Sequence, residues 1–305
     1  KLKLRFPRLT TRVKKLILLA APAAIGAGVA QINLLIDIII ASFLPEGSVS
    51  FLYYADRVSQ LPLGVVGVAV GTALLPLLSR QLRSGDFDEV HKSQNSALRG
   101  ALLLTIPATV ALIVLAEPLI ITLFERGEFT SSDSVATANA LLIYAIGLPA
   151  FVLIKVFVPA FFAREDTKTP VIIAALCVLA NVILNILLMK ALGHLGIALA
   201  TSISGWLNAI FLCFFLIKRG NLIIEFRLIL RLISIFFASG LMGICIWLIH
   251  KNLIEPLSSD LGLRVTGLLI LISVGVLIYF LAAYFLKAFT ISEAVSIFKN
   301  TKTKG

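Results

Sequence analysis

Apolar residues in this chain are grouped into long continuous runs that are separated by shorter polar segments. Eight runs can be placed, at residues 16–44, 51–78, 97–116, 135–163, 171–189, 195–217, 228–249 and 263–286. About 20 apolar residues let an α-helix cross the hydrocarbon core of a bilayer, whereas membrane β-strands show shorter segments of alternating character. The pattern therefore predicts an all-α integral membrane protein with about eight transmembrane helices. The longest predicted loops are residues 79–96, 117–134, 218–227 and 250–262.

The composition agrees with this class of protein. Hydrophobic residues make up 59% of the chain and charged residues only 14%, and the mean hydropathy is +1.02. These values exclude an ordinary soluble domain. The cysteines lie far apart inside apolar runs and the histidines lie in or beside loops, so no disulfide, zinc or hydrolytic spacing emerges.

The positive charges are distributed unevenly between the two sides of the predicted bundle. If residues 1–15 are cytoplasmic, 21 Lys and Arg residues fall in inside segments and 4 fall outside. Because positive residues mark cytoplasmic loops, both termini are predicted to be cytoplasmic. The net charge of +11 is then mainly a topology signal, and no nucleic-acid partner is needed to explain it.

The most specialised stretch begins at residue 51. Polar and small residues recur there at spacings of three or four, which places them on one face of a helix: Tyr53, Arg57, Gln60, Gly64, Gly67 and Gly71. An arginine costs roughly 2.5–3.5 kcal/mol or more inside a bilayer, so it normally faces a bundle interior or a watery cavity. The alternative is that Arg57 extends along the helix to the nearer membrane surface.

Two further polar groups interrupt the apolar runs. Asp37 needs a partner, and Asn181, Asn185 and Thr201 supply amide and hydroxyl oxygens on the faces of later helices. Together they form a set of hard oxygen ligands suited to Na⁺, although the same residues would also serve as hydrogen bonds between helices. Lys155 either reaches the cytoplasmic surface or faces the same cavity as Arg57, in which case the cavity would attract an anion such as phosphate.

Three sequence strings carry a family resemblance. They are YYADRVSQLPLGVVGVAVGTALLPLLSR at 53–80, LFERGEFTSSD at 123–133 and FFAREDTKTP at 161–170. In order and spacing they resemble the MurJ/MviN family of bacterial inner-membrane flippases for lipid II, within the multidrug/oligosaccharidyl-lipid/polysaccharide exporter superfamily. The resemblance covers essentially the whole chain, and the first string is the most specific.

The resemblance implies a domain arrangement. The family has fourteen transmembrane helices, arranged as two six-helix lobes and a final pair, and the eight runs match helices seven to fourteen. Residues 1–15 would then be a cytoplasmic basic segment, 16–218 the second six-helix lobe, 219–290 the two additional helices and 291–305 a cytoplasmic tail. A chain that starts without Met, in a basic segment unlike a signal peptide, is then expected to lack an N-terminal lobe.

The resemblance also implies roles for the polar residues. Arg57 matches an essential arginine that lines the family's central cationic cavity, Asp56 precedes it in the same motif, and Lys155 matches a lysine of the tenth helix. Gln60 stands where some relatives carry an acid. The last two helices resemble a pair that forms a groove for the long lipid tail.

A Na⁺ site described in the family corresponds by position to Asp37, Asn181, Asn185 and Thr201. Asn185 departs from the stronger pattern, because a carboxylate there would add negative charge. No other cofactor is implied.

The function that follows is transport. The expected partners are lipid II, membrane lipids and the missing N-terminal lobe, and the expected location is the bacterial inner membrane. The chain is expected to flip lipid II by alternating access without acting as an enzyme. A related exporter of a drug or another polyprenyl-linked oligosaccharide is the alternative. A membrane-embedded lipid-phosphate enzyme is a distant one, because Asp37 and Asp56 lack catalytic partners in sequence.

Overall fold

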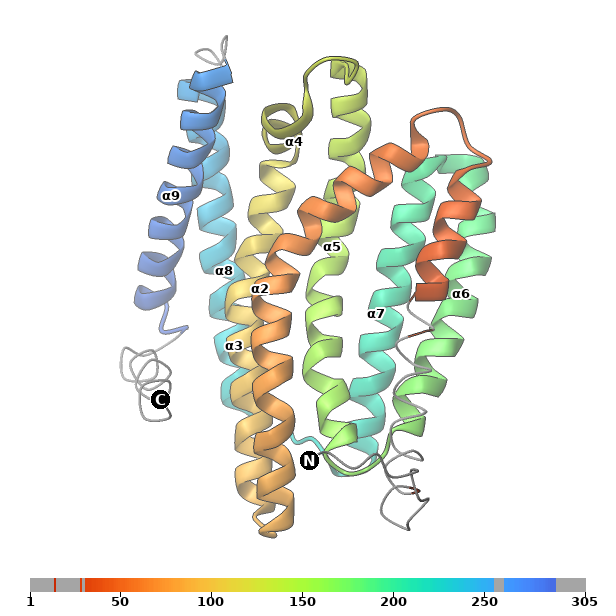
Figure 1. The fold of residues 1–305 in the computed structure, drawn as a ribbon. Coiled ribbons are helices and arrows are strands. Elements are labelled where there is room, and N and C mark those ends of the chain that lie inside the picture. The colour runs from red at the N-terminus through yellow and green to blue at the C-terminus, as the bar shows by residue number, and fades with distance from the viewer. Residues whose placement is uncertain (1–13, 15–27, 29–30, 255–260, 289–305) are drawn as a thin grey trace, which may run out of the picture.

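The computed structural model describes residue 14, residue 28 and residues 31–254 and 261–288. All regular structure in these parts is helical, and the helices run roughly up and down a single bundle (Figure 1). A short helix, Gln31–Ala41, comes first. It is followed by α2 (Ser48–Arg83), α3 (Phe87–Val114), α4 (Ala116–Phe124), α5 (Ser131–Phe162), α6 (Lys168–Leu192), α7 (His194–Lys218), α8 (Phe226–Ile249), the π-helical turn η1 (His250–Ile254) and α9 (Leu261–Phe285).

The predicted fold class is confirmed. Among the described residues, six helices are long and apolar enough to cross a membrane, and they cover the predicted runs from 97–116 onward to within two residues of the run ends. The run at 51–78 lies within the 36-residue helix α2, which at 1.5 Å per residue is about 54 Å long. Of the first run, the structure describes residue 28 and residues 31–44. The predicted basic segment and tail lie outside the described residues, apart from Lys14.

The predicted loops are wrong in part. The segment 117–134 contains most of α4, and α3 begins at Phe87, inside the predicted loop 79–96. The early start of α3 is explained by its polar first turns. Asp86 caps α3 by accepting a hydrogen bond from the backbone N–H of Glu89, so the helix begins well before its apolar part.

Helix α5 is the centre of the packing. It contacts α2 and α3 on one side and α7 on the other. Its residues Leu141, Leu148 and Val152 are almost completely buried. By contrast, α6 exposes an apolar stripe at spacings of three or four (Ile172, Leu176, Leu179, Ile183 and Leu187), as expected for a surface that faces lipid.

Helices α5 and α7 approach each other closely. Ser202 Oγ on α7 donates a hydrogen bond to the backbone oxygen of Ile143 at 2.8 Å, and Trp206 Nε1 donates to that of Ile146 at 3.0 Å. Gly147 lies on the same face of α5 and is buried. A Cβ atom at Gly147 would lie only 2.7 Å from Ser202 Oγ and 3.1 Å from Ser202 Cα. The glycine is therefore what permits this helix spacing.

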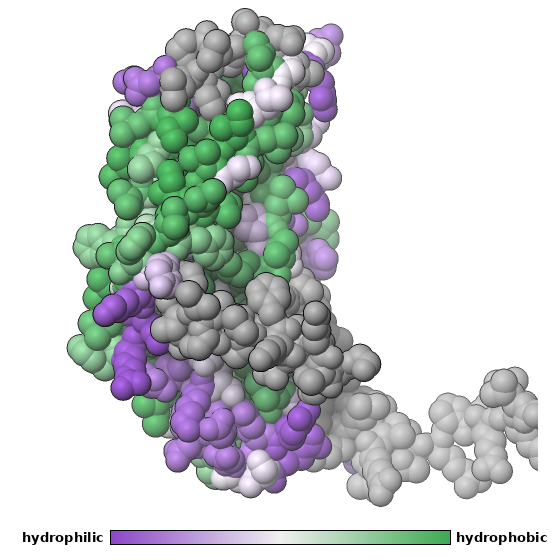
Figure 2. Space-filling view, turned by 90° about the vertical axis from the view of Figure 1, so that its left-hand side faces the viewer, coloured by the Kyte–Doolittle hydropathy of each residue, from purple (hydrophilic) through white to green (hydrophobic). Residues whose placement is uncertain are grey.

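The last two helices form a second hydrophobic core with α3. Leu102 and Ile106 of α3 are buried there with Ile235, Met242 and Leu271. Viewed from the side of α8 and α9, the molecule shows a broad hydrophobic band with hydrophilic side chains gathered toward its lower end (Figure 2).

A hydrogen bond connects α9 directly to α3. Tyr279 Oη donates to the backbone oxygen of Leu103 at 2.5 Å, and the tyrosine is 2% exposed. Pro107 lies four residues after Leu103 and has no N–H to donate, so the Leu103 carbonyl lacks its usual intrahelical partner. The tyrosine of one helix thus pairs the carbonyl that the proline of another leaves free.

Gly147→Ala is expected to destabilise the protein by about 1–3 kcal/mol, because the added methyl meets the α7 backbone. The thermal-unfolding midpoint in detergent would measure this. Gly240→Ala in α8 is the control, because a Cβ there meets nothing within 4 Å. If both variants kept the midpoint of the unmodified protein, the close contact of α5 and α7 would be refuted.

Tyr279→Phe is expected to cost about 1–3 kcal/mol, because a buried carbonyl is left without a partner. The matched control is Tyr284→Phe on the same helix, where the side chain is 48% exposed. Thermal unfolding of the two variants side by side is the measurement. An equal effect of the two changes would contradict the role of the Tyr279 hydroxyl.

Candidate functional site

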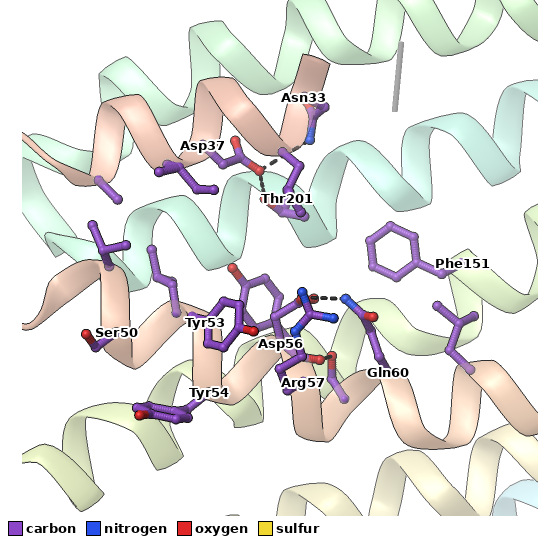
Figure 3. Close-up of a pocket in the computed structure, with 18 of the residues that line it drawn as sticks. Asn33, Asp37, Ser50, Tyr53, Tyr54, Asp56, Arg57, Gln60, Phe151 and Thr201 are labelled. Atoms are coloured by element: carbon purple, nitrogen blue, oxygen red, sulfur yellow. Dashed lines mark hydrogen bonds between the residues drawn. The ribbon is translucent and has the colours of Figure 1, made fainter. Parts of the chain in front are cut away.

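A cavity of about 430 Å³ lies between the Gln31–Ala41 helix, α2, α5 and α7. Its polar lining residues come from all four helices: Asn33, Asp37, Ser50, Tyr53, Tyr54, Asp56, Arg57, Ser59, Gln60, Tyr144 and Thr201. Figure 3 shows two polar groups on opposite walls, one around Asp37 and Thr201 and the other around Asp56, Arg57 and Gln60. Predicted substrate-binding residues (Asp56, Arg57 and Gln60) and two residues of the predicted Na⁺ site (Asp37 and Thr201) thus line one cavity.

Arg57 has an exposed side chain on this lining. Its Cζ atom lies 4.8 Å from the centre of the Tyr53 ring, one turn earlier on α2, which is a cation–π arrangement. Within the described part of the chain, no carboxylate forms an ion pair with this guanidinium. Its donors are therefore available to an anion that enters the cavity.

Asp56 is held by the amide of Gln60. Gln60 Nε2 donates to Asp56 Oδ2 across one helical turn. A glutamine can make this bond, whereas an acid at position 60 would repel the carboxylate. Gln60 thus orients the one acid that neighbours Arg57 in sequence.

Lys155 lies beside the cavity and does not line it. It follows the lining residue Phe151 by one turn on α5, and its side chain is exposed. A Cβ atom at Gly67 would lie 3.3 Å from Lys155 Cγ, so the lysine stem covers this glycine of α2. Gly67 is ten residues beyond Arg57, or about 15 Å along the helix. The structure therefore places the two cations along one face of the protein, at different depths.

Asp37 is the centre of a hydrogen-bond network that joins three helices. Its Oδ1 accepts from Asn185 Nδ2 of α6 at 2.6 Å. Its Oδ2 accepts from Thr201 Oγ1 of α7 and from Asn33 Nδ2, each at 3.2 Å. Asn181 and Asn185 are fully buried, and Asn185 Nδ2 also donates to Asn181 Oδ1 at 2.9 Å. All four residues of the predicted Na⁺ site thus meet at one place.

The oxygen atoms around Asp37 are of the kind that a hard cation binds. Asn185 Oδ1 is buried and finds no hydrogen-bond partner among the described residues. In one orientation of the Asn181 amide, its oxygen accepts from Asn185 Nδ2 and also faces Asp37 Oδ1 and Asn33 Oδ1, which suits a cation between these oxygens. In the turned orientation, the Asn181 nitrogen donates to Asp37 Oδ1 and Asn33 Oδ1, each at 3.0 Å, and the bond from Asn185 is lost. Across the described residues, no group of three or more His, Cys, Asp or Glu side chains could hold a metal ion.

Sequence reasoning missed three lining residues of α5, namely Tyr144, Leu148 and Phe151. Tyr144 is 8% exposed and Phe151 is half-buried, yet both reach the cavity. A tyrosine inside an otherwise apolar run was the available signal for Tyr144. No sequence signal marked Phe151, because aromatic residues are common in such helices.

The chain is similar to one family over most of its length. The family model described as "Lipid II flippase MurJ" matches residues 1–259. A "Probable lipid II flippase MurJ" of Rhizobium meliloti (strain 1021) is 47% identical over 282 residues, which is 92% of this chain and 52% of that protein. A protein of the same description from Rickettsia prowazekii (strain Madrid E) is 43% identical over 276 residues, covering 90% of this chain and 54% of its own length.

A solved structure agrees with these sequence matches. It is described as "Lipid II flippase MurJ, inward closed conformation" and superposes with a TM-score of 0.73 at 30% identity, over 92% of this chain and 56% of that one. The chain thus spans about half the length of the relatives that it matches.

Proposed function

The chain belongs to the lipid II flippase MurJ family and is a multi-pass membrane protein, and from this we propose that it takes part in moving lipid II across the bacterial inner membrane. The observation that carries the proposal is the Arg57 guanidinium, which lines a cavity and has no carboxylate partner among the described residues. Lipid II is the substrate that the descriptions of the relatives name.

The substrate chemistry suits such a cation. Lipid II carries a diphosphate between a polyprenyl tail and a disaccharide-pentapeptide head. A guanidinium binds phosphate oxygens in a bidentate manner, and its desolvation at membrane depth is offset when an anion arrives. The cavity would receive the diphosphate end of the head group while the tail stays in lipid. Lys155, lower on the same face, would meet the head group on its way.

The arrangement of the helix ends supports one orientation. The α2–α3, α5–α6 and α7–α8 connections lie at one end of the bundle (Figure 1). That end carries most of the described Lys and Arg residues outside the spans, and Arg126, Lys190, Lys251 and Arg264 lie toward the other. We assign the basic end, and with it both termini, to the cytoplasm.

No bond needs to be made or broken in this transport. Among the described residues of the lining, the two acids, Asp37 and Asp56, are both held by amides, and there is no histidine. A lipid-phosphate enzyme would need a nucleophile or general base next to its substrate. A drug exporter would keep the fold, but the relatives at 43–47% identity carry the lipid II description.

We further propose that Asp37, Asn181, Asn185 and Thr201 hold Na⁺. The ion would neutralise the half-buried Asp37 carboxylate, and oxygen atoms on three helices would bind the ion in place of the present hydrogen bonds. It can drive a conformational change only if it binds one state of the transporter better than the other. The amide at position 185 makes the site less negative than a second carboxylate would.

Arg57→Ala is expected to abolish growth in a strain depleted of its own lipid II flippase, when the complete gene product is supplied from a plasmid. The physical reason is the loss of the cavity's anion-binding group. Arg57→Lys keeps the charge but loses the bidentate geometry, so partial rescue is expected. Arg83→Ala, at the exposed cytoplasmic end of α2, is the matched control and should rescue fully. Full rescue by an equally expressed Arg57→Ala would show that transport does not need this cation, as expected if the Arg57 side chain only extends to the membrane surface.

Replacing Na⁺ by choline is expected to lower the thermal-unfolding midpoint of the purified protein, because a ligand of the native state stabilises it by mass action. At a concentration 100 times the dissociation constant, the effect is about 2.7 kcal/mol. Asp37→Asn and Asn185→Leu should remove this dependence on Na⁺. Asp166→Asn, which lies in a loop, should retain it. If the thermal-unfolding midpoint were the same in Na⁺ and in choline, the four residues would serve only to form hydrogen bonds between helices.

A further inference from the structure

A second cavity, of about 270 Å³, lies where α3 and α8 begin. Its lining consists of Lys92, Asn95, Ser96, Arg99, Glu225, Arg227, Leu228 and Arg231. We call it the α3–α8 pocket. Four of these residues are cations and one is a carboxylate, so the lining carries a net charge of +3. Such a concentration of positive charge around a small cavity selects for an anion.

The pocket is built on a fixed backbone. Asn95 is 6% exposed, and its Nδ2 donates to the backbone oxygens of Ile223 at 2.7 Å and His91 at 2.9 Å. Its Oδ1 accepts from the backbone N–H of Glu225 at 3.2 Å. This amide ties the segment before α8 to α3. The cations on the two helices therefore face one cavity in a defined arrangement.

The start of α8 adds to the attraction for an anion. Glu225 is the N-cap residue, and its side chain accepts no hydrogen bond from the first turn. The unpaired N–H groups at a helix start carry partial positive charge. Arg227 and Leu228, which line the pocket, lie in this first turn. Among the described residues, Arg227 has no ion-pair partner.

The ion pair of Lys92 at the rim of the pocket is a weak competitor for an anionic ligand. Lys92 Nζ lies 2.9 Å from Glu89 Oε1, with both side chains largely exposed. Exposed pairs contribute little to stability, so Lys92 can turn to a ligand at small cost.

The surroundings of the pocket indicate a lipid as the source of the anion. Ile223, Ile224, Phe226 and Leu230 are exposed beside it, and Phe226 is 71% exposed. On the same side of the molecule, hydrophilic side chains lie directly below the hydrophobic band (Figure 2). This is the level at which lipid phosphates meet acyl chains. A free phosphate would use the cations but would leave the apolar residues without a partner.

We propose that the α3–α8 pocket binds the phosphate group of an anionic membrane lipid, with its acyl chains along the outer face of α8. The pocket spans the junction between the main bundle and the α8–α9 pair. A bound lipid would therefore bridge α3 and α8 at the end opposite η1, and would stabilise the docking of the last two helices.

The test uses the complete gene product in an uncharged detergent. Dioleoylphosphatidylglycerol is titrated in, and the bound lipid is counted by native mass spectrometry while the thermal-unfolding midpoint is followed. Dioleoylphosphatidylcholine, with the same chains and no net charge, and inorganic phosphate are the two comparison ligands. The anionic lipid is expected to bind most tightly and to raise the midpoint most.

The decisive variant is Arg227→Gln with Arg231→Gln. It should weaken binding of the anionic lipid by about tenfold or more, as for the loss of a charge-assisted hydrogen bond. Arg80→Gln with Lys168→Gln removes the same charge from exposed positions at the same end, outside the pocket, and should bind as the unmodified protein does.

Equal binding of the two dioleoyl lipids, or unchanged binding of the anionic lipid by the pocket variant, would overturn the proposal. An equal rise of the midpoint with inorganic phosphate would overturn the assignment to a lipid. Rescue of the depletion strain by Arg57 variants is a separate readout, so this test succeeds or fails independently of lipid II transport.

Discussion

The constraint on which this structure depends is that a polar group inside a bilayer must find its partner within the protein. Leu103 shows this most simply. Its carbonyl is released by Pro107 and is paired by Tyr279 from a helix 176 residues later in the chain. Ser202 and Trp206 of α7 also find partners inside the protein, because their side chains donate to the backbone oxygens of Ile143 and Ile146. Specific hydrogen bonds therefore join helices whose apolar surfaces would otherwise prefer lipid equally well.

Asp37 and Arg57 differ in how far this constraint is met. Asp37 is satisfied by an amide and a hydroxyl from two other helices and by the Asn33 amide of its own helix, so it joins the three helices whether or not a cation binds. Arg57 is left with an aromatic ring beside it and no carboxylate in the described part of the chain. A cation kept available at such a cost is typical of a site that waits for an anionic ligand.

The α8–α9 pair is attached by contacts of three kinds. These are a hydrophobic core with α3, the Tyr279 hydrogen bond and a 3.4 Å ion pair between Arg264 and Glu125. The α3–α8 pocket lies at the far end of the same junction. The terminal helices are thus held at several points, and a lipid phosphate would add an anchor at the basic end.

The amino-acid sequence by itself determined the fold class, the approximate spans and the positions of the polar residues inside them. Continuous apolar runs leave a chain few options in a bilayer, and a charge within such a run is conspicuous. The motif around Arg57 was sufficient to indicate the family. Helical spacing also grouped Tyr53, Arg57 and Gln60, and all three line the cavity.

Only the tertiary structure decided which polar residues meet. Asp37, Asn185 and Thr201 are separated by 148 and 164 residues, and spacing along one helix cannot report the distance between helices. For the same reason, the sequence could not show that Lys155 lies outside the Arg57 cavity. It also could not show that Tyr144 and Phe151 line that cavity or that the α3–α8 pocket exists. These features depend on the rotation and depth of each helix against its neighbours, which close contacts such as Gly147 with Ser202 determine.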